Sequence, residues 1–230
     1  MSAIRSDLGW STPERITVRG KDLPGEILGS LNLGDMAFFE LTGKFPDAKQ
    51  SRLFNAMAVT LVEHGITPSA LAARLTYLGA PEAMQAAVAS GLCGLGSVFV
   101  GSMEAVARML WENEDVGKMK RVPGLGHPLH KPVDPRTARL FEIARETGFY
   151  GGYCRRMEEI GRERNLVVNA TGAIGALACE LGLDWRAVRG IGVIARAVGL
   201  VGHLLEESRQ PMAEAVWHQI EAQASAHLRK

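Results

Sequence analysis

The amino-acid sequence predicts an all-α fold. Apolar residues recur at helical spacing through most of the 230 residues, whereas only Ile16–Arg19 alternates in the manner of a strand. Proline and glycine stand between the helical segments, at positions where helices ordinarily begin and end. A chain of this length can bury one substantial core, arranged in one or two domains.

The first half of the chain is expected to form a series of helices. Gly43 closes the second of them, and Asp47 is a typical N-cap of the third. Pro68 and Pro81 each stand where the first turn of a helix tolerates proline. The helices expected in this half are 24–30, 33–42, 47–63, 68–78, 81–99 and 103–114.

The second half resumes the helical pattern after a loop that ends near Pro135. Asn169–Gly172 has the composition of an entry turn to a buried helix, and Glu158 stands four residues before Arg162 as in a helical ion pair. The helices expected in this half are 137–147, 153–164, 165–181, 185–207 and 212–228.

Two segments of the chain are almost free of charge. Residues 83–103 lie between Glu82 and Glu104 and are long enough to cross a bilayer, but their small side chains favour a tightly packed helix of a soluble protein. The helix expected over 165–181 is nearly uncharged as well. Two such helices exceed the needs of one core, so we expect a homodimer in which they face the partner.

Charge and cysteine content narrow the class of protein. The formal net charge of +1 argues against binding to nucleic acid or to a membrane surface. Cys93, Cys154 and Cys179 show no CxxC spacing, which is typical of reduced thiols in a cytoplasmic protein. The N-terminus lacks the charged and apolar pattern of a secretory signal, which also favours the cytoplasm.

The segment Arg121–Thr137 carries the residues best suited to chemistry. Gly124 and Gly126 precede His127, and Arg136 follows nine residues after it. Glycine permits close approach of a ligand to the backbone, and an arginine can hold a carboxylate by two hydrogen bonds. We expect a site for an anionic, carbonyl-bearing substrate; a turn histidine beside an N-capped helix is the alternative. The surrounding cations are Lys118, Lys120, Arg121 and Lys131.

A second histidine lies at the end of an expected helix. His64 precedes Gly65 there, so it is either a helix-terminal histidine stabilised by the helix dipole or a functional residue. The six histidines show no HxxH or HExxH spacing, and we expect no metal site. The Gly94–Gly96 pair does not follow a strand, so it predicts no dinucleotide site.

Five motifs, in order along the chain, resemble those of the citrate synthase superfamily and its citryl-CoA lyase branch. Gly124–Arg136 resembles the GxGH…DPR loop, and Val62–Arg74 resembles the DHG…SxxAAR segment. Asn169–Leu177 is similar to the NVDGxIxAL start of a helix. Ala195–His203 and Glu207–Pro211 match the closing segments, and the C-terminal domain of ATP-citrate lyase is similar too.

The resemblance implies an all-helical dimer whose large and small domains close over a carboxylate and coenzyme A. The large domain, which forms the dimer, would comprise residues 1–110 and 180–230, and the small domain residues 111–179. The implied reaction makes or breaks a carbon–carbon bond of a 3-hydroxyacyl-CoA such as citryl-CoA. Coenzyme A would be part of the substrate, and no metal is expected.

The resemblance also implies roles for single residues. His127 would polarise a ketone or handle the proton of an alcohol, while His64 and Arg136 would hold substrate carboxylates. Arg196 matches another carboxylate-binding position, and Arg209 one that reaches across from the other subunit. Phe99 would contact the substrate. The residues expected to bind coenzyme A are Lys118, Lys120, Arg121, Gly124, Gly126 and Lys131.

Three positions depart from the pattern of the superfamily. Thr171 replaces its aspartate base, and a threonine hydroxyl is far too weakly basic for that task. Phe99 replaces a histidine, as in ATP-citrate lyase, and Pro128 replaces an arginine. Our leading hypothesis is an enzyme in which Glu63, the substrate's own carboxylate or water replaces the base. The alternative is a degenerate protein that binds a carboxylate or CoA ester, or pairs with an intact paralogue.

Overall fold

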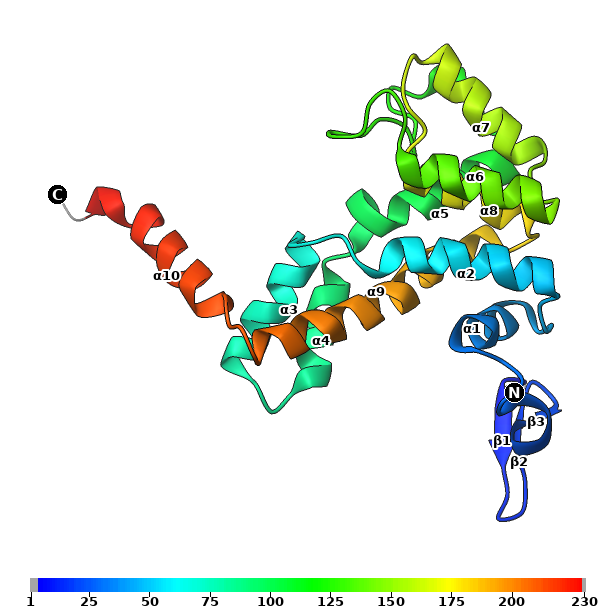
Figure 1. Ribbon diagram of the computed structural model, residues 1–230, viewed down its shortest axis with the longest axis horizontal. Coiled ribbons are helices and arrows are strands. Elements are labelled where there is room, and N and C mark those ends of the chain that lie inside the picture. Colours follow the sequence, from blue (N-terminus) through cyan, green and yellow to red (C-terminus); the bar gives the residue numbers. More distant parts are fainter. Residues whose placement is uncertain (1–3, 229–230) are drawn as a thin grey trace.

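The computed structural model describes residues 4–228, and most of them are helical, as predicted (Figure 1). A small N-terminal sheet precedes helices α1 to α10 in this part of the chain. The helices are α1 (Leu33–Thr42), α2 (Ala48–Val62), α3 (Pro68–Gly79), α4 (Met84–Cys93), α5 (Gly101–Trp111), α6 (Pro135–Thr147), α7 (Gly152–Glu163), α8 (Ala170–Glu180), α9 (Trp185–Glu207) and α10 (Ala213–Ala224).

The sheet is antiparallel, with strand order β1 (Gly9–Ser11), β2 (Ile16–Val18) and β3 (Lys21–Asp22). The strand expected near Ile16 is confirmed as β2, whereas β1 and β3 are too short to show a pattern in the sequence. A π-helical turn, Leu23–Ile27, replaces the helix expected over 24–30. The sheet lies at one end of the molecule, remote from the later helices (Figure 1).

Helix ends that depend on neighbouring residues lie where the sequence predicts them. The Asp47 side chain accepts hydrogen bonds from the backbone N–H groups of Lys49 and Gln50, and Gln50 returns the bond to the Asp47 N–H. Gly43 ends α1 in the left-handed conformation, with φ 74°. Both devices satisfy backbone groups that a helix end leaves open, so the helix boundaries follow from local sequence.

The helix expected over 81–99 is wrong in its bounds. Pro81 lies in a turn before α4, and α4 ends at Cys93. A π-helical turn, Gly96–Val100, then leads into α5, and the two helices are bent by 58° at the break. The glycine Gly94 lies at the bend, where a Cβ would stand 3.3 Å from the Ser69 Cα of α3.

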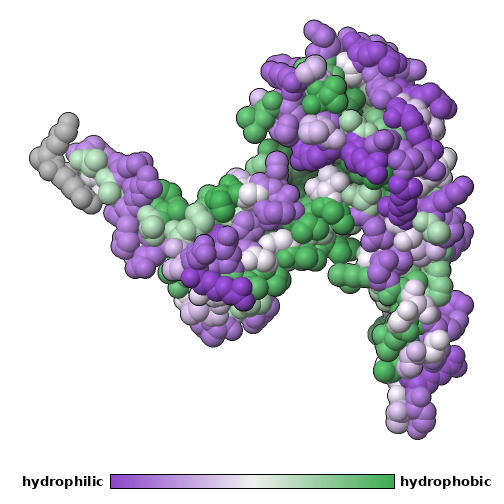
Figure 2. Space-filling view, viewed as in Figure 1, coloured by the Kyte–Doolittle hydropathy of each residue, from purple (hydrophilic) through white to green (hydrophobic). Residues whose placement is uncertain are grey.

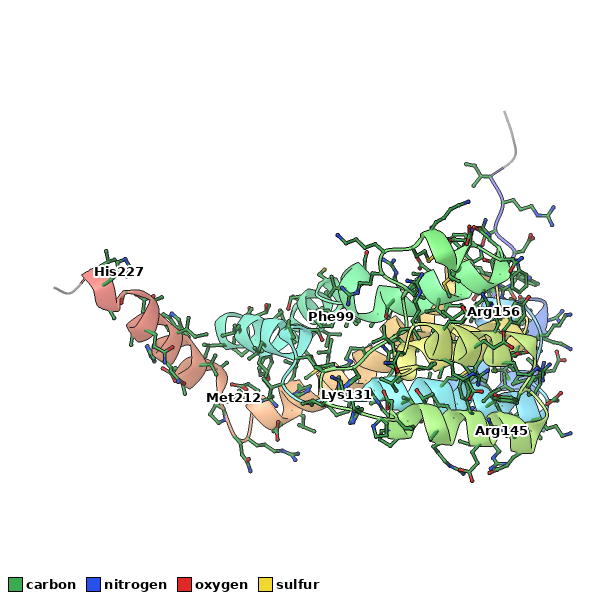
Figure 3. The ribbon with its side chains drawn as sticks, turned by 90° about the horizontal axis from the view of Figure 1, so that it is seen from above. Phe99, Lys131, Arg145, Arg156, Met212 and His227 are labelled. Carbon is green, nitrogen blue, oxygen red and sulfur yellow. The ribbon has the colours of Figure 1, made fainter. Side chains whose placement is uncertain are left out.

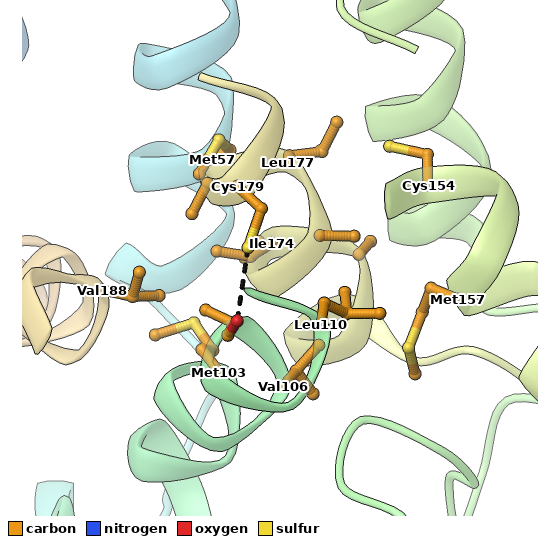
Figure 4. Packing of buried hydrophobic residues seen from close by; sticks show 14 of the residues in the cluster. Met57, Met103, Val106, Leu110, Cys154, Met157, Ile174, Leu177, Cys179 and Val188 are labelled. Atoms are coloured by element: carbon orange, nitrogen blue, oxygen red, sulfur yellow. Dashed lines mark hydrogen bonds between the residues drawn. The ribbon is translucent and has the colours of Figure 1, made fainter. Parts of the chain in front are cut away.

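Helix α8 forms the centre of the main apolar core (Figure 4). All its residues except Thr171 and Glu180 are buried, because α5, α6 and α7 cover it. Gly175 lets α5 approach closely, since a Cβ there would lie 2.7 Å from the Val106 side chain. The prediction that this helix faces a partner is therefore wrong, and its apolar composition reflects the core of its own chain.

The charged face of α7 differs in detail from the prediction. Glu158 accepts a hydrogen bond from the Tyr150 hydroxyl at 2.5 Å, and its other oxygen lies 3.9 Å from Arg145. The expected Glu158–Arg162 pair is therefore replaced by contacts between α7 and the end of α6. On the solvent side, Arg156 pairs with Glu163 at 3.1 Å.

The last two helices shape one end of the molecule. Helix α9 matches its predicted bounds, is apolar and long enough to cross a membrane, and has half of its most apolar window buried within the chain. Helix α10 ends at Ala224, before a short 3-10 turn, and projects from the body beyond α3 (Figure 1). On the face drawn in Figure 2, the surface of this end of the molecule carries both apolar and polar side chains.

The core does not divide at the predicted domain boundaries. One cluster of buried apolar residues runs from Phe38 of α1 to Ile191 of α9 and includes α5 to α8. A second cluster joins Ala73, Ala87 and Leu200, from α3, α4 and α9. The division into a large and a small domain stays a prediction.

Candidate functional site

A cavity of about 990 Å³ opens where the ends of α2, α6 and α8 meet the middle of α9 and the loop before α6. It is lined by residues that lie up to 136 positions apart in the chain, from Thr60 to Arg196. The residues singled out in the sequence that line it are His64, Phe99, Arg121, Gly124, Gly126, His127, Arg136, Thr171 and Arg196.

His64 reaches the cavity because α2 stops one residue earlier than its apolar pattern suggests. Glu63 leaves the helical conformation, and its carboxylate accepts hydrogen bonds from the backbone N–H groups of His64 and Gly65. Gly65 adopts a left-handed φ of 70°, which turns the chain toward α3. Burial, followed by the nearby charges of Arg136 and Arg196, holds the pKa of the His64 imidazole below its ordinary value.

The loop that carries His127 is fastened to the segment before α8. Leu125 and Val168 form an isolated antiparallel bridge, and the Gly126 N–H donates to the Val167 carbonyl at 2.7 Å. Asn169 adds a side-chain bond, with Nδ2 donating to the Gly126 carbonyl at 2.8 Å. The loop is therefore held as a short ribbon rather than as a free connection.

Hydrogen bonds determine the tautomer of His127. Its Nδ1 accepts from the backbone N–H groups of Leu129 at 3.1 Å and His130 at 3.0 Å, so Nδ1 carries no proton. In the neutral ring Nε2 is then the protonated nitrogen. Burial, followed by the charges of His130 and Arg136, lowers the pKa of His127 and favours this neutral form.

Arg136 stands beside the protonated nitrogen of His127. The Arg136 Nη2 lies 3.3 Å from His127 Nε2, and because both atoms are donors they cannot satisfy one another. Together they can donate to one oxygen atom of a ligand, such as a carboxylate or carbonyl oxygen. The arrangement is thus suited to an oxygen that carries negative charge.

Asp134 orients Arg136 from the interior. Its carboxylate is fully buried and accepts from Arg136 Nε at 3.0 Å, from Arg136 Nη2 at 2.8 Å and from the Ala170 N–H at 3.1 Å. Burial raises the pKa of Asp134, but the hydrogen bonds from Arg136 and Ala170 outweigh it, and the pKa lies below the usual range. The carboxylate is therefore ionised and ties the start of α6 to the start of α8.

Arg196 brings a cation into the cavity from the middle of α9. It is only 7% exposed, and its Nε donates to the Leu61 carbonyl at 3.2 Å. Its Nη1 is buried and has no hydrogen-bond partner among residues 4–228. Arg196 lines the cavity as a residue, so its guanidinium is a candidate donor to a ligand oxygen there.

Thr171 lies in the first turn of α8, beside these donors. Its hydroxyl donates to the Asn169 side-chain oxygen at 2.7 Å, and the Gly172 N–H donates to the same oxygen at 3.1 Å. Among the described lining residues the acidic one is Glu114, which pairs with Arg108 at 3.1 Å. Glu63 does not line the cavity, so it is not placed to replace the missing base.

Several expected residues lie outside the cavity. Lys118 is exposed and pairs with Asp115 at 3.2 Å, and Lys120 is exposed as well. Lys131 is exposed on the loop after His127, near the middle of the molecule in Figure 3. Arg209 is exposed after the end of α9, thirteen residues and roughly 20 Å of helical rise beyond Arg196.

The structure adds residues that sequence patterns did not single out as site residues. Asn169 and Asp134 hold the loop and α8 together; both belong to motifs of the sequence, but neither was named as a site residue. Arg108, Ser97 and Ser102, from α5 and the π-helical turn before it, also line the cavity. Across residues 4–228, no three His, Cys, Asp or Glu side chains form a group that could hold a metal ion.

The sequence matches the family described as citrate synthase, C-terminal domain, over residues 30–216. Citrate synthase from Haloferax volcanii is 26% identical over 198 residues, which is 77% of this chain and 52% of that protein. ATP-citrate synthase beta chain protein 1 from Oryza sativa subsp. japonica is 28% identical, over 73% of this chain and 33% of that protein. The chain thus spans about half or less of the length of these relatives.

Solved structures agree with these sequence relatives. The structure of citryl-CoA lyase from Hydrogenobacter thermophilus has a TM-score of 0.82 and 35% identity, over 89% of this chain and 86% of that one. ATP citrate lyase from Methanothrix soehngenii, solved with citrate and coenzyme A, has a TM-score of 0.74 over 91% of this chain and 39% of that one. At 21% identity the second likeness concerns the fold alone.

Proposed function

Because this chain belongs to the citrate synthase family, we propose that it makes or breaks a carbon–carbon bond next to a CoA thioester, with a citryl-CoA-like substrate. The observation that carries the proposal is the convergence of donors on one cavity. His127 Nε2 lies 3.3 Å from Arg136 Nη2, which keeps a second N–H besides the one that it donates to Asp134, and Arg196 lines the same cavity. A di- or tricarboxylate supplies the oxygen atoms that these groups require.

The neutral tautomer of His127 supports a role as a hydrogen-bond donor to the substrate. In the direction of condensation, Nε2–H donates to the ketone oxygen and stabilises the negative charge that develops on it. In the direction of cleavage, water takes the proton of the alcohol, and Nε2–H and Arg136 stabilise the resulting alkoxide as it becomes a carbonyl. His64 and Arg196, which line the same cavity, hold the remaining carboxylates.

The part of the cavity lined by the turn Gly96–Val100, α5 and residues 119–122 suits the thioester arm of coenzyme A. Its walls are apolar at Val98, Met109 and Val122, which fits the pantetheine chain. Arg108 and Arg121 stand at this end and fit the phosphates, although Arg108 is paired with Glu114. Coenzyme A would enter as part of the substrate.

The acyl carbon must exchange a proton without the carboxylate that the superfamily uses. Thr171 occupies that place, and its hydroxyl proton is engaged by Asn169. Among residues 4–228 the acidic residue that lines the cavity is Glu114, which is paired with Arg108; we therefore assign the transfer to the substrate's own carboxylate or to a water molecule. Loss of a positioned acid or base typically costs about 10²–10⁴ in rate, so a slow or specialised enzyme results.

The same observation supports a second function. A protein that retains the carboxylate donors but lacks the base can bind a carboxylate or CoA ester without turnover. It would act as a binding subunit, alone or beside an intact paralogue. Turnover separates the two functions, because both predict binding.

The test mixes citryl-CoA with the purified protein and follows acetyl-CoA by chromatography, while calorimetry measures the binding of citrate and of coenzyme A. Acetyl-CoA and oxaloacetate in equal amounts support the lyase. Binding without product on a panel of 3-hydroxyacyl-CoA esters supports the binding subunit, and absence of both binding and turnover contradicts both functions.

A matched pair of variants then tests position 171. Thr171→Asp restores the carboxylate and should raise citryl-CoA cleavage, since aspartate near a helix N-terminus is also favourable. Thr171→Asn has the same shape without the charge and should give no gain. Equal rates for the two variants would mean that the pocket has been remodelled around another substrate.

A further inference from the structure

One face of α9 holds the last residues of α2 in place. Arg196, Gly199 and His203 are spaced three and four residues apart and share that face. Arg196 Nε donates to the Leu61 carbonyl at 3.2 Å. At Gly199 the helices approach so closely that a Cβ would lie far inside van der Waals contact with the Val62 carbonyl oxygen.

His203 contacts Glu63, the residue that follows Val62 in the sequence. Hydrogen bonds from Arg74 determine the tautomer of the His203 ring. Arg74 Nε and Nη2 lie 3.2 Å and 3.0 Å from His203 Nδ1, and arginine can only donate. Nδ1 therefore accepts, and Nε2 carries the proton. His203 Nε2 lies 3.0 Å from a Glu63 oxygen and donates to that carboxylate.

Arg74 is itself immobilised. It is 1% exposed, its Nη1 donates to Glu207 at 2.7 Å, and Glu206 pairs with Nη2. The second oxygen of Glu207 accepts from the backbone N–H groups of Met212 at 2.9 Å and Ala213 at 2.8 Å, at the start of α10. The imidazole of His203 is thus anchored to a buried network that includes the corner between α9 and α10.

At the other end of this network, Glu63 shapes the turn that presents His64. Its carboxylate accepts from the His64 N–H at 2.9 Å and from the Gly65 N–H. Burial raises the pKa of Glu63, but the Gly65 N–H, His203 and the His64 N–H together lower it below its usual value. Glu63 is half exposed, so a carboxylate there would move in solvent if no buried donor held it.

We propose that His203 is a positioning residue: its Nε2–H holds Glu63, and Glu63 orders the His64–Gly65 turn so that His64 faces the cavity. The contribution of His64 to ligand binding rests on the proposed function; the ordering of the turn does not. The same α9 face supplies Arg196, so the register of α2 on α9 sets the separation of these two ligand groups.

Two variants separate the two bonds of the imidazole. In His203→Gln, the amide nitrogen can take the place of Nε2 and still donate to Glu63. In His203→Asn, the shorter amide can accept from Arg74 in place of Nδ1 but does not reach Glu63. His203→Gln loses the two contacts from buried Arg74, whereas His203→Asn loses only the contact to half-exposed Glu63. His203→Gln should therefore have the lower free energy of unfolding, yet only His203→Asn releases the turn.

The measurement is amide hydrogen exchange of residues 64 and 65 in the free protein, followed by calorimetry with citrate. His203→Asn should exchange these amides about tenfold faster than wild type, as expected for the loss of a hydrogen bond to a charged group, and bind citrate about tenfold more weakly. His203→Gln should resemble wild type in both. Since exchange needs no ligand, it reports on the turn even if the proposed function fails.

Glu63→Ala provides a check that avoids the buried ring. The side chain is half exposed, so its removal leaves the core intact, and it should reproduce the faster exchange of His203→Asn. Unchanged exchange at residues 64 and 65 in both Glu63→Ala and His203→Asn would overturn the proposal. Faster exchange in His203→Gln to the same degree as in His203→Asn would also overturn it, because loss of the donor would then not be the cause.

Discussion

The backbone of Gly124 lies directly against that of Gly172. A Cβ on Gly124 would stand 2.5 Å from the Gly172 Cα, and a Cβ on Gly172 would be closer still to the Gly124 carbonyl oxygen. The Asn169 N–H donates to that same oxygen at 3.0 Å. The His127 loop is therefore seated on the first turn of α8, which brings His127 and Thr171 to one cavity.

Gly172→Ala should displace the His127 loop. The added methyl group meets the Gly124 carbonyl, so we expect a loss of about 1–3 kcal/mol in the free energy of unfolding, measured in urea, and weaker citrate binding. Gly190→Ala on α9 is the control, since nothing lies within 4 Å of its Cβ; it should raise stability by about 0.5–1 kcal/mol. Equal effects in the two variants would contradict the close approach.

Arg196→Met should separate binding from stability. The unpaired Nη1 makes this arginine costly to bury, and its loss offsets the bond to Leu61, so the free energy of unfolding should change by less than about 1 kcal/mol. Affinity for citrate should fall about 100-fold by calorimetry, as for a lost hydrogen bond to a charged group. Arg121→Met, at the far end of the cavity, should weaken coenzyme A instead; weaker citrate binding there would contradict the assignment of the two ends.

Activity should fall on acidification through a midpoint below the ordinary histidine value of about 6.5. The pKa of His127 is lowered, so the neutral ring with Nε2–H persists to lower pH than in a free histidine. Protonation of Nδ1 would oppose the Leu129 and His130 N–H groups, which now donate to it. The midpoint can be measured from the His127 ring protons by NMR.

Protonation of His127 is coupled to folding, because the pKa of its ring is lower in the folded chain than in the unfolded chain. Between about pH 6.5 and the lowered pKa, the unfolded chain binds a proton that the folded chain does not, so stability falls as pH falls through this window and is unaffected above it. His127→Asn keeps an acceptor for the two backbone N–H groups but cannot titrate. Its stability should therefore depend less on pH here, and an unchanged pH profile would exclude His127 as the source.

Dimerisation remains a prediction, and α9 offers the surface on which to test it. Ile194, Val198, Val201 and Leu205 recur at helical spacing and are 39–50% exposed. Val198→Asp should convert a dimer into a monomer in light scattering at micromolar concentration. Leu129→Asp, on the exposed loop, should leave the mass unchanged. A monomeric mass for the wild-type protein would defeat the prediction.

Features that depend on neighbouring residues were predictable from the sequence. The Asp47–Gln50 capping box, the glycine that ends α1 and the helix that begins after Asp134 each close within two to four residues, so the pattern contains all the partners. The association of Gly124, His127 and Arg136 could also be predicted, because the three residues lie within one short segment of the chain. The motif resemblance, in addition, placed His64, Thr171 and Arg196 in one site, and the structure brings them to one cavity.

The tertiary structure decided which of these groups are free to act. Glu63 was a candidate base in the sequence, but the His203 side chain, 140 residues away, holds it outside the cavity. Helix α8 looked like a dimer surface, yet α5, α6 and α7 cover it. Hydrogen-bond partners and burial depend on contacts between distant segments, which residue type and spacing do not specify. The sequence thus determined the helices and the residues available to the site. Only packing determined that Arg196 Nε donates to the Leu61 carbonyl while its Nη1 has no partner among residues 4–228.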